Sequence, residues 1–290
     1  KYTIILNNQT INQASDKDLY NIIDLWRSSF EDEDEKSTNF YFMNRYQKEN
    51  TYVLKNNDFV VSMLQIIPYT LIFDEKEEDV YFILGVATNK TYRKQGLMKK
   101  LMNYVLSLSK YQNAKIILQA YNPELYYQFG FSQNYYHKVT EVDNNLYENN
   151  FLIKTVKNND YIKLLNLYNQ FCKKYTGYRK RNIEYYQNYL ALRCEAFDEK
   201  IKVFDLNNKS IGYVIYSEED VVIKISEIIY LEQAYLDMII GHFMIFDKKV
   251  IIESDLKAII KGDYKYVCTM MSNFLENNFQ DNNFYINECL

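Results

Sequence analysis

The sequence predicts an α/β protein in which strands, tight turns and amphipathic helices alternate along the chain. Apolar runs at 80–86 and 115–120 are rich in β-branched and aromatic residues, a composition typical of buried strands. The apolar positions of 97–108 recur every three or four residues, as on one buried face of a helix. A polar turn at 56–58 lies between two apolar runs, which indicates a hairpin.

The remaining elements of the N-terminal part follow in chain order. An apolar run at 2–6 predicts a first strand. The apolar positions of 19–30 have helical spacing, and Ser15 suits the start of that helix because its side chain can cap free backbone N–H groups. Two strand pairs are then expected, at 52–67 and 69–86, each closed by a polar turn.

A polar segment at 141–150 interrupts this patterning and is the best candidate for a linker. Beyond it the order of elements repeats, with a helix, a hairpin at 201–216, and a strand followed by a helix at 221–246. A chain of 290 residues is long enough for two cores. We therefore predict two domains with similar patterns, at 1–142 and 151–290.

Composition excludes several classes of protein. Hydrophobic residues make up 48% and charged residues 25% of the chain, and Gly and Pro number only 7 and 2, which excludes disordered and collagen-like chains. A net charge of −4 gives no reason to expect a surface for nucleic acid. No apolar run reaches the roughly 18 residues needed to span a bilayer, and no secretory signal is visible. We expect a cytoplasmic protein without nucleic-acid or membrane partners.

Cysteine and histidine usage gives no indication of a metal site. The four cysteines are widely spaced without a C-x-x-C pair, and His137 and His242 are the two histidines. Neither a zinc site nor a disulfide framework is therefore expected, and no cysteine neighbours a histidine in sequence as a nucleophile would suggest. A G-x-S-x-G pattern is absent, which argues against an α/β-hydrolase.

The stretch 79–108 contains the most informative local pattern. A strand ending at Gly85 to Thr88 is followed by a polar connection and then by Arg93 to Met98, which opens a helix. The first N–H groups of a helix have no intrahelical partner and lie at the positive end of its dipole, so they favour phosphate. Gly96 removes a Cβ that would keep a pyrophosphate from the backbone. The Walker and Rossmann glycine patterns are both absent.

This stretch resembles the acetyl-CoA loop of the GNAT-type N-acetyltransferases, whose signature is [R/Q]-x-x-G-x-[G/A]. Arg93 and Gly96 fit the signature, and Met98 stands where the family prefers a small residue. Further along, Tyr126, Gly130 and Phe131 match the Y-x-x-x-G-F pattern that follows the fifth strand in the family. The resemblance implies the α+β GNAT fold, in which helices flank a mixed, largely antiparallel central sheet.

The resemblance also implies acetyl-CoA as co-substrate and a set of residues that hold it. Backbone groups of Val86, Ala87 and Thr88 would bind the pantetheine arm as a strand would. Asn122 either contacts that arm or caps the short helix that follows. The residues expected around the pyrophosphate are Arg93, Lys94, Gln95, Gly96, Leu97, Met98 and Lys99, although Arg93 and Lys94 could also be the solvated start of a helix.

The second domain resembles a GNAT domain without its own cofactor site. Its loop at 231–235 contains no Arg-x-x-Gly, so it lacks both the glycine and the basic residue that a pyrophosphate needs. The arrangement is similar to the tandem-GNAT group of bacterial enhanced intracellular survival acetyltransferases. That group usually adds a third, sterol-carrier-like domain, for which we expect no room in this chain.

Tyr126 is the expected general acid, because the Y-x-x-x-G-F tyrosine protonates the departing thiolate in the family. Tyr127 is the alternative, and either tyrosine could simply pack. The general base is less evident. The resemblance implies the terminal carboxylate of Leu290, with Glu288, a carboxylate of the acidic run 31–35 or a water chain as alternatives, and a frayed terminus as the simplest interpretation.

The acidic run follows the first helix and would border the acceptor site in a GNAT enzyme, where its field could attract a cationic amine, although most such runs are solvated loops. We therefore predict an acetyl-CoA-dependent N-acetyltransferase that acts on the primary amine of a small, cationic acceptor by direct transfer in a ternary complex. The alternative is a non-catalytic acyl-CoA-binding sensor or protein-interaction module. The identity of the acceptor and the oligomeric state do not follow from the sequence.

Overall fold

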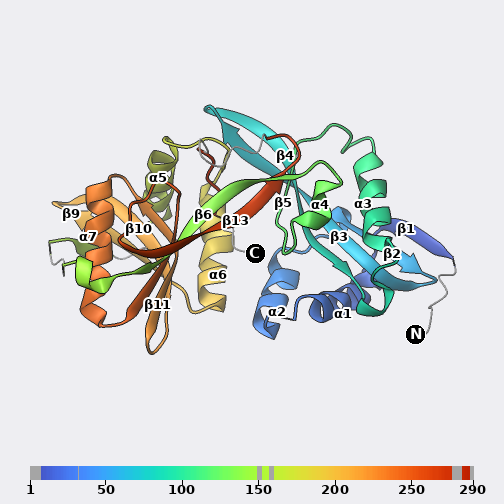
Figure 1. The fold of residues 1–290 in the computed structure, drawn as a ribbon, viewed down its shortest axis with the longest axis horizontal. Helices are drawn as coiled ribbons and strands as arrows, with labels where there is room; N and C mark the ends of the chain where they lie inside the picture. The colour runs from blue at the N-terminus through green and yellow to red at the C-terminus, as the bar shows by residue number, and fades with distance from the viewer. Residues whose placement is uncertain (1–7, 32, 149–151, 157–159, 276–282, 288–290) are drawn as a thin grey trace.

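The structure is a computed structural model of the chain, and it describes residues 8–31, 33–148, 152–156, 160–275 and 283–287. The strand predicted at 2–6 lies outside these residues. We call residues 8–148 the first half and residues 152–287 the second half. The fold class predicted from the sequence is confirmed, because helices flank a mixed sheet in which most strand pairs are antiparallel (Figure 1).

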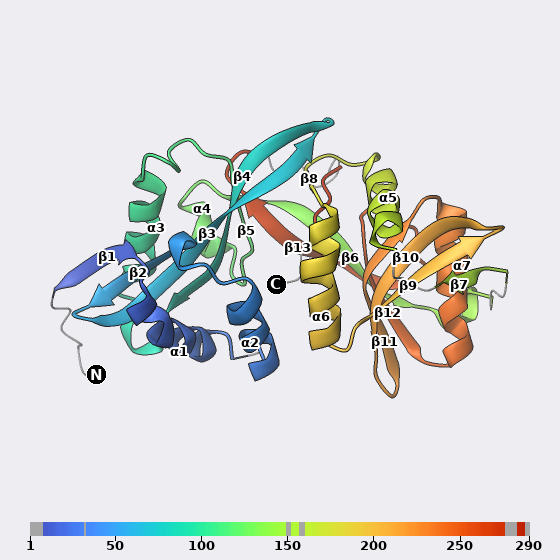
Figure 2. The same cartoon turned by 180° about the vertical axis from the view of Figure 1, so that it is seen from behind.

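The first half begins with a strand and two helices, and most of its sheet strands follow. Its main elements are β1 (Gln9–Gln13), α1 (Leu19–Ser29), α2 (Glu35–Asn44), β2 (Thr51–Asn56), β3 (Phe59–Phe73), β4 (Lys76–Thr88), α3 (Leu97–Ser107), β5 (Ile116–Leu118), α4 (Glu124–Tyr127) and β6 (Ser132–Val142). Helices α1 and α2 cover one face of the sheet and α3 covers the other (Figures 1 and 2).

The second half repeats much of this order. Its main elements are β7 (Lys154–Val156), α5 (Tyr161–Cys172), β8 (Tyr178–Arg179), a π-helical turn (Tyr185–Leu190), α6 (Ala191–Ala196), β9 (Lys200–Leu206), β10 (Lys209–Glu218), β11 (Val222–Tyr230), α7 (Gln233–Phe243), β12 (Lys249–Ser254) and β13 (Gly262–Ser272). None of the helices among the described residues is long and apolar enough to cross a membrane.

Local sequence explains where α1 and the central hairpin begin and end. Ser15 and Asp18 form a reciprocal capping box in front of α1, which satisfies N–H groups that the helix leaves free. Between β3 and β4 the turn contains only Asp74 and Glu75, both with positive φ, as in the tight turns that suit paired strands.

The sequence predicted two separate strand pairs here, whereas β3 runs without a break from Phe59 to Phe73. Pro68 does not interrupt it and faces Tyr81 of β4 in the register. The polar residues 76–79, which the sequence placed in a turn, extend the hairpin instead, because they pair with 70–73. Polarity alone therefore indicated a loop where the chain forms an exposed hairpin end.

One sheet of 13 strands runs through both halves. At its centre β13 of the second half lies between β5 and β6, pairing Met271 with Leu118 and Tyr266 with Lys138. In turn β6 of the first half pairs with β12, at Val139 and Glu253. Figure 1 shows this long β6–β13 pair crossing the middle of the molecule. Strands β6 and β13 therefore each pair with strands of the other half. The predicted domain boundary near 142–151 stays a prediction.

Contacts outside the sheet also join the halves. Phe40 of α2 packs against Phe197 with ring centroids 5.4 Å apart, and Lys36 forms an ion pair with Asp198 at 3.2 Å. The segment 283–287 lies between the halves, since Tyr285 is buried in the core of the second half and Ile286 in the core of the first.

Candidate functional site

A gap opens in the backbone ladder where β4 passes β5. The two strands pair in parallel up to Ile83 and Leu118, and β4 then continues to Thr88 without that partner. Its antiparallel register with β3 also shifts here, with one extra residue on β4. A bulge of this kind turns backbone N–H and C=O groups out of the ladder, which makes them available to a ligand.

Gly85 is required at this bulge for two reasons. Its φ of +60° belongs to the left-handed region that side chains disfavour. A Cβ at this position would also lie 2.6 Å from Cζ3 of Trp26, well inside van der Waals contact. The bulge and the ring of Trp26 therefore touch.

The loop before α3 exposes the start of that helix. Gly96 caps the helix with a φ of +74°, and an added Cβ there would meet no atom within 4 Å. Lys100 is the first residue whose N–H bonds back to Gly96 O, at 2.9 Å, so the N–H groups of the first turn have no intrahelical partner. Lys94 also has positive φ, which folds the loop tightly.

The predicted cofactor residues lie together at one end of β4. The side chain of Arg93 turns back, and its Nε–H donates to Thr88 O at 3.0 Å, which ties the loop to the strand end. The hydroxyl of Ser62 donates to Ala87 O at 2.9 Å, so that carbonyl is occupied. Met98 is partly buried against the core under α3 rather than exposed in the loop. The roles of Val86 and the other residues toward acetyl-CoA stay predictions.

Tyr126 and Tyr127 have different environments. Tyr126 is only 6% exposed and packs in the same core as Ile83 and Leu118, beside the gap between β4 and β5. Burial raises the pKa of its hydroxyl to about 12. Tyr127 is 50% exposed, and its hydroxyl accepts a hydrogen bond from Gln133 Nε2 at 3.0 Å. Burial therefore distinguishes Tyr126 from Tyr127, and the role of Tyr126 as general acid stays a prediction.

Asn122 caps the short helix α4, as one of its two predicted roles required. Its Oδ1 accepts the backbone N–H of Glu124 at 3.2 Å. Leu290 and Glu288, the residues considered for the general base at the end of the chain, lie outside the described residues.

The acidic run does not behave as a uniform solvated loop. Glu31 pairs with Lys90, Asp34 accepts the backbone N–H of Ser37 at 2.7 Å and caps α2, and Glu35 lies 3.4 Å from Arg27. The pairing with Lys90 lowers the pKa of Glu31, and the hydrogen bonds from Ser37 lower that of Asp34.

Glu33 differs from its neighbours because it is half-buried. Its Oε2 accepts the indole N–H of Trp26 at 2.9 Å. Desolvation raises the pKa of this carboxyl, although the bond from Trp26 opposes that effect. Trp26 is in the core, and its ring contacts the Glu33 carboxylate at one edge and the Gly85 bulge at the other.

Tyr41 and Gln65 lie next to Trp26 and Glu33 on the same side of the site. The Tyr41 ring stacks on Trp26 with centroids 4.4 Å apart, and its hydroxyl donates to Gln65 Oε1 at 2.5 Å. The Nε2 of Gln65 is buried without a hydrogen-bond partner among the described residues. Sequence reasoning missed both residues, although Gln65 is a polar residue inside the apolar run 59–67, which is a signal that could have found it.

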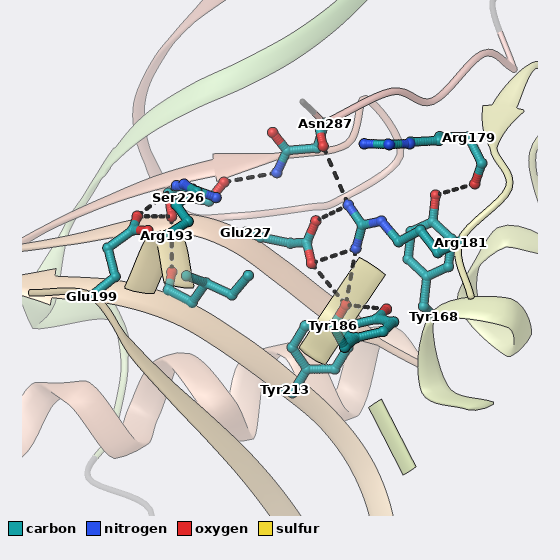
Figure 3. A network of polar contacts seen from close by, with 11 residues as sticks. Tyr168, Arg179, Arg181, Tyr186, Arg193, Glu199, Tyr213, Ser226, Glu227 and Asn287 are labelled. Carbon is teal, nitrogen blue, oxygen red and sulfur yellow. Dashed lines mark hydrogen bonds and ion pairs between the residues drawn. The ribbon is translucent and has the colours of Figure 1, made fainter. Parts of the chain in front are cut away.

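The second half has a similar bulge and gap, but side chains fill it. Strand β11 carries an extra residue at Ser226 opposite β10, and its pairing with β12 ends at Ile225. Figure 3 shows the backbone carbonyl of Ser226 accepting a hydrogen bond from the side chain of Asn287, at 2.8 Å. The next residue, Glu227, is 3% exposed and accepts Arg181 Nη1 and Nη2 at 2.9 and 2.7 Å.

The guanidinium group of Arg181 lies beside this second bulge, where it pairs with Glu227. Its Cζ lies 4.0 Å from the ring centroid of Tyr168 and 4.7 Å from that of Tyr185 (Figure 3 draws Tyr168 beside it). Tyr168 follows Asp160 in α5 at the same spacing as Trp26 follows Asp18 in the first half. In the second half, the guanidinium of Arg181 therefore lies against two tyrosine rings and the Glu227 carboxylate. In the first half, Trp26 and Glu33 lie near the bulge, and the backbone of β4 beyond Ile83 is not paired with β5.

Among the described residues, no three His, Cys, Asp or Glu side chains gather in a group that could hold a metal ion. The features that bear on the chemistry are the open helix start, the β4 bulge, the buried Tyr126 and the contact between Glu33 and Trp26.

Comparisons with known proteins give one family match and several similar folds. Residues 10–133 match the acetyltransferase (GNAT) domain family. A probable N-acyltransferase from Enterococcus faecalis is similar in structure, with a TM-score of 0.74 and 18% identity over 92% of this chain and 72% of its own. A GCN5-related N-acetyltransferase from Anabaena variabilis has a TM-score of 0.74 and 17% identity, covering 91% and 72%.

Eis1 from Mycobacterium abscessus is also similar, with a TM-score of 0.69 and 10% identity over 91% of this chain and 73% of its own. At these identities the structural likenesses show the fold alone. A search of curated proteins gave no match.

Proposed function

Since residues 10–133 match a GNAT acetyltransferase domain, we propose that the chain is an enzyme of the GNAT N-acetyltransferase type that transfers an acetyl group from acetyl-CoA to the amine of a small, cationic acceptor. The observation that carries the proposal is the gap between β4 and β5, with the open start of α3 on one side and Glu33 and Trp26 on the other. A co-substrate and an acceptor can approach the gap from opposite faces of the sheet.

Acetyl-CoA would be held mainly by backbone groups. Backbone groups of Val86, Ala87 and Thr88 on the edge of β4 that β5 leaves free would bind the pantetheine arm, apart from the carbonyls of Ala87 and Thr88, which already accept Ser62 and Arg93. The N–H groups from Arg93 to Lys99 would bind the pyrophosphate. The open space at Gly96 supports this placement, because nothing lies within 4 Å of where a Cβ would be. An N–H group near Val86 would polarise the thioester carbonyl.

Glu33 would bind the ammonium group of the acceptor. It is the half-buried carboxylate of the acidic run, and its neighbours in that run, apart from Asp32 outside the described residues, are paired or cap α2. A carboxylate taken partly out of water gains more from a cationic partner than one on the open surface. The indole of Trp26 then places the bound amine within reach of the β4 bulge.

In the reaction the amine loses its proton and attacks the thioester carbon, a C–N bond forms, the C–S bond breaks, and the sulfur takes a proton. Tyr126 would supply that last proton, which its hydroxyl carries at neutral pH. Burial raises the pKa of the hydroxyl to about 12, so the proton would move in concert with the departure of the sulfur. Glu33 is a candidate for the base that receives the amine proton, directly or through water. The terminal carboxylate of Leu290 is the other candidate.

An assay of CoA thiol release against a panel of primary amines tests the proposal. We expect turnover with cationic amines, and Tyr126→Phe should lower kcat by about 10²–10⁴-fold while acetyl-CoA still binds, as loss of a general acid does. Tyr127→Phe is the matched control and should change kcat little. Tight binding of acetyl-CoA without turnover of any amine would favour the acyl-CoA-binding sensor, which the sequence suggested because Met98 stands where the family prefers a small residue.

A further inference from the structure

A row of three aromatic rings runs from the bulge of β4 to solvent on the side of the site where Glu33 lies. It begins at Trp26, which touches the bulge at Gly85. The Phe30 ring lies next to Trp26, with ring centroids 4.7 Å apart, and the Tyr121 ring follows Phe30 at 6.0 Å. Exposure rises along the row, because Trp26 is 4% exposed, Phe30 is partly buried and Tyr121 is 79% exposed. A ligand can therefore reach the outer end of the row from solvent.

The row crosses the gap between β4 and β5 on the face that α1 and α2 cover. Phe30 directly follows α1 and packs on the core beneath that helix, whereas Tyr121 belongs to the segment that leaves β5 after Leu118. Strand β4 contributes Gly85 at the inner end. A molecule that lies along these rings would therefore extend from the bulge of β4 toward the chain beyond β5.

Glu33 determines the charge that suits such a molecule. Its backbone N–H donates to Phe30 O at 3.1 Å, and its Oε2 accepts Trp26 Nε1–H at 2.9 Å, so the carboxylate lies beside the inner end of the row. The other carboxylates of the acidic run that the structure describes form ion pairs or cap α2. The described part of the run therefore favours a ligand with one ammonium group, placed at the inner end.

Tyr121 determines the shape that suits the other end of the molecule. Because its ring is 79% exposed, an apolar group that packs on it would gain from the removal of apolar surface from water. An aromatic group would gain further from the offset or tilted stacking that pairs of rings prefer, and a straight alkyl chain would not. The outer end of the row therefore favours an aromatic group.

We infer that Tyr121 determines acceptor specificity: the acceptor is a primary amine joined by a short alkyl chain to an aromatic ring, with its ammonium group at Glu33 and its ring on Tyr121. The short chain would lie along Phe30, whose ring separates Trp26 from Tyr121. This inference rests on the proposed function, because it places the acceptor at Glu33.

Calorimetric titration of phenethylamine and of propylamine into the full chain, with CoA present at saturation, tests the inference. CoA fills the co-substrate side and cannot donate an acetyl group, so the titration measures amine binding alone. We expect phenethylamine to bind at least about 10-fold more tightly than propylamine, because only phenethylamine has a ring to bury against Tyr121. Tyr121→Ala should remove most of this difference and leave the affinity for propylamine unchanged. Tyr121→Phe should keep the difference, because the ring and not the hydroxyl binds the ligand.

Tyr20→Ala is the matched control, because Tyr20 is a tyrosine of α1 with a similar exposure, 76%, and is not one of the three rings of the row. It should leave both affinities unchanged. Equal affinity of the wild type for the two amines, unchanged affinity for phenethylamine in Tyr121→Ala, or an equal loss in Tyr121→Phe would each overturn the inference. Tighter binding of the diamine putrescine than of phenethylamine would also overturn it, since a second ammonium group would then lie where the ring is expected.

Acetylation of the same amines, measured separately, distinguishes this inference from the proposed function. Turnover of both amines with equal kcat/KM would overturn the inference and leave the acetyl transfer standing. Preferential binding of phenethylamine that depends on Tyr121, without turnover of any amine, would overturn the acetyl transfer and leave the ligand class standing. Binding of neither amine would overturn both the inference and the role of Glu33 toward the acceptor.

Discussion

At the scale of single residues, Glu33 shows how burial can distinguish one carboxylate from its neighbours in an acidic run. The folded state raises the pKa of Glu33, so the protonated form is favoured and any stability from this group is lost as pH rises through the folded pKa. Keeping Glu33 ionised at neutral pH is therefore a cost to the fold. A cationic acceptor would offset that cost. Binding of such an acceptor would explain why a carboxylate is half-buried at this position, whereas a contribution to stability would not.

Glu33→Gln should raise KM for a cationic amine by about 10-fold or more at pH 7, because the charge-assisted bond to the ammonium is lost. The melting temperature should stay the same or rise, since an unfavourable charge is removed. In the wild type, kcat/KM should fall as pH drops through the raised pKa, at a higher pH than for an exposed glutamate. Initial rates from pH 4 to 8 and thermal melts check both. A lower melting temperature with unchanged KM would contradict the role.

Gly85→Ala should destabilise the fold through a steric clash as well as through backbone strain. Both the positive φ and the 2.6 Å approach of an added Cβ to Trp26 oppose the substitution, and together they should cost about 1–3 kcal/mol. Gly130→Ala is the control, because Gly130 also has positive φ but a Cβ there meets no atom within 4 Å. Urea unfolding followed by fluorescence of Trp26, the one tryptophan of the chain, measures both variants. Equal losses in the two would show that no clash exists.

At the scale of elements, local sequence predicted some features and missed others for physical reasons. The helix start at Gly96 and the turn at Gly130 depend on backbone conformations that glycine favours, so short patterns could find them. The bonds of Gln65 with Tyr41, and of Glu33 with Trp26, join residues on different elements. No local pattern specifies which side chains a fold will bring together, so neither pair could be predicted.

The order of the strands in the sheet was the other feature that the sequence could not predict. The sequence patterns predicted no strand at 262–272, and the place of β13 between β5 and β6 depends on contacts between residues more than about 100 positions apart in the chain. The alternation of apolar residues indicates which face of a strand is buried, but it does not indicate which strand lies next to it in the sheet. The sequence therefore predicted two similar patterns and could not predict that they exchange strands.

Gly96→Val should remove acetyl-CoA binding while the fold persists. A β-branched residue at φ +74° is strained, and its side chain would stand over the first-turn N–H groups that the pyrophosphate needs. We expect affinity for acetyl-CoA to fall by about 100-fold, equal to about 2.7 kcal/mol. Calorimetric titration checks it, and Gly130→Val controls for the strain of a β-branched residue at positive φ. Unchanged affinity in the Gly96→Val variant would refute the placement of the loop.

At the scale of the whole molecule, the exchange of strands implies that the two halves unfold together. Removing β13 would leave one edge of β5 and one edge of β6 unpaired, and removing β6 would leave one edge of β12 unpaired. The segment 283–287 adds side chains to both cores. A sheet continuous through both halves gives no place where one half can unfold and leave the other intact, which is the condition for a single cooperative transition.

Arg181→Met tests this cooperativity, because Arg181 lies in the second half and Trp26 in the first. Losing the guanidinium leaves Glu227 buried without its ion-pair partner, which should cost about 3–5 kcal/mol. If the halves form one unit, the urea midpoint by Trp26 fluorescence should fall together with the midpoint by circular dichroism. The double variant Arg181→Met with Glu227→Gln should recover part of the loss, since no unpaired charge remains. A Trp26 midpoint that stays at the wild-type value while circular dichroism shows an earlier transition would mean that the halves unfold separately despite their shared sheet.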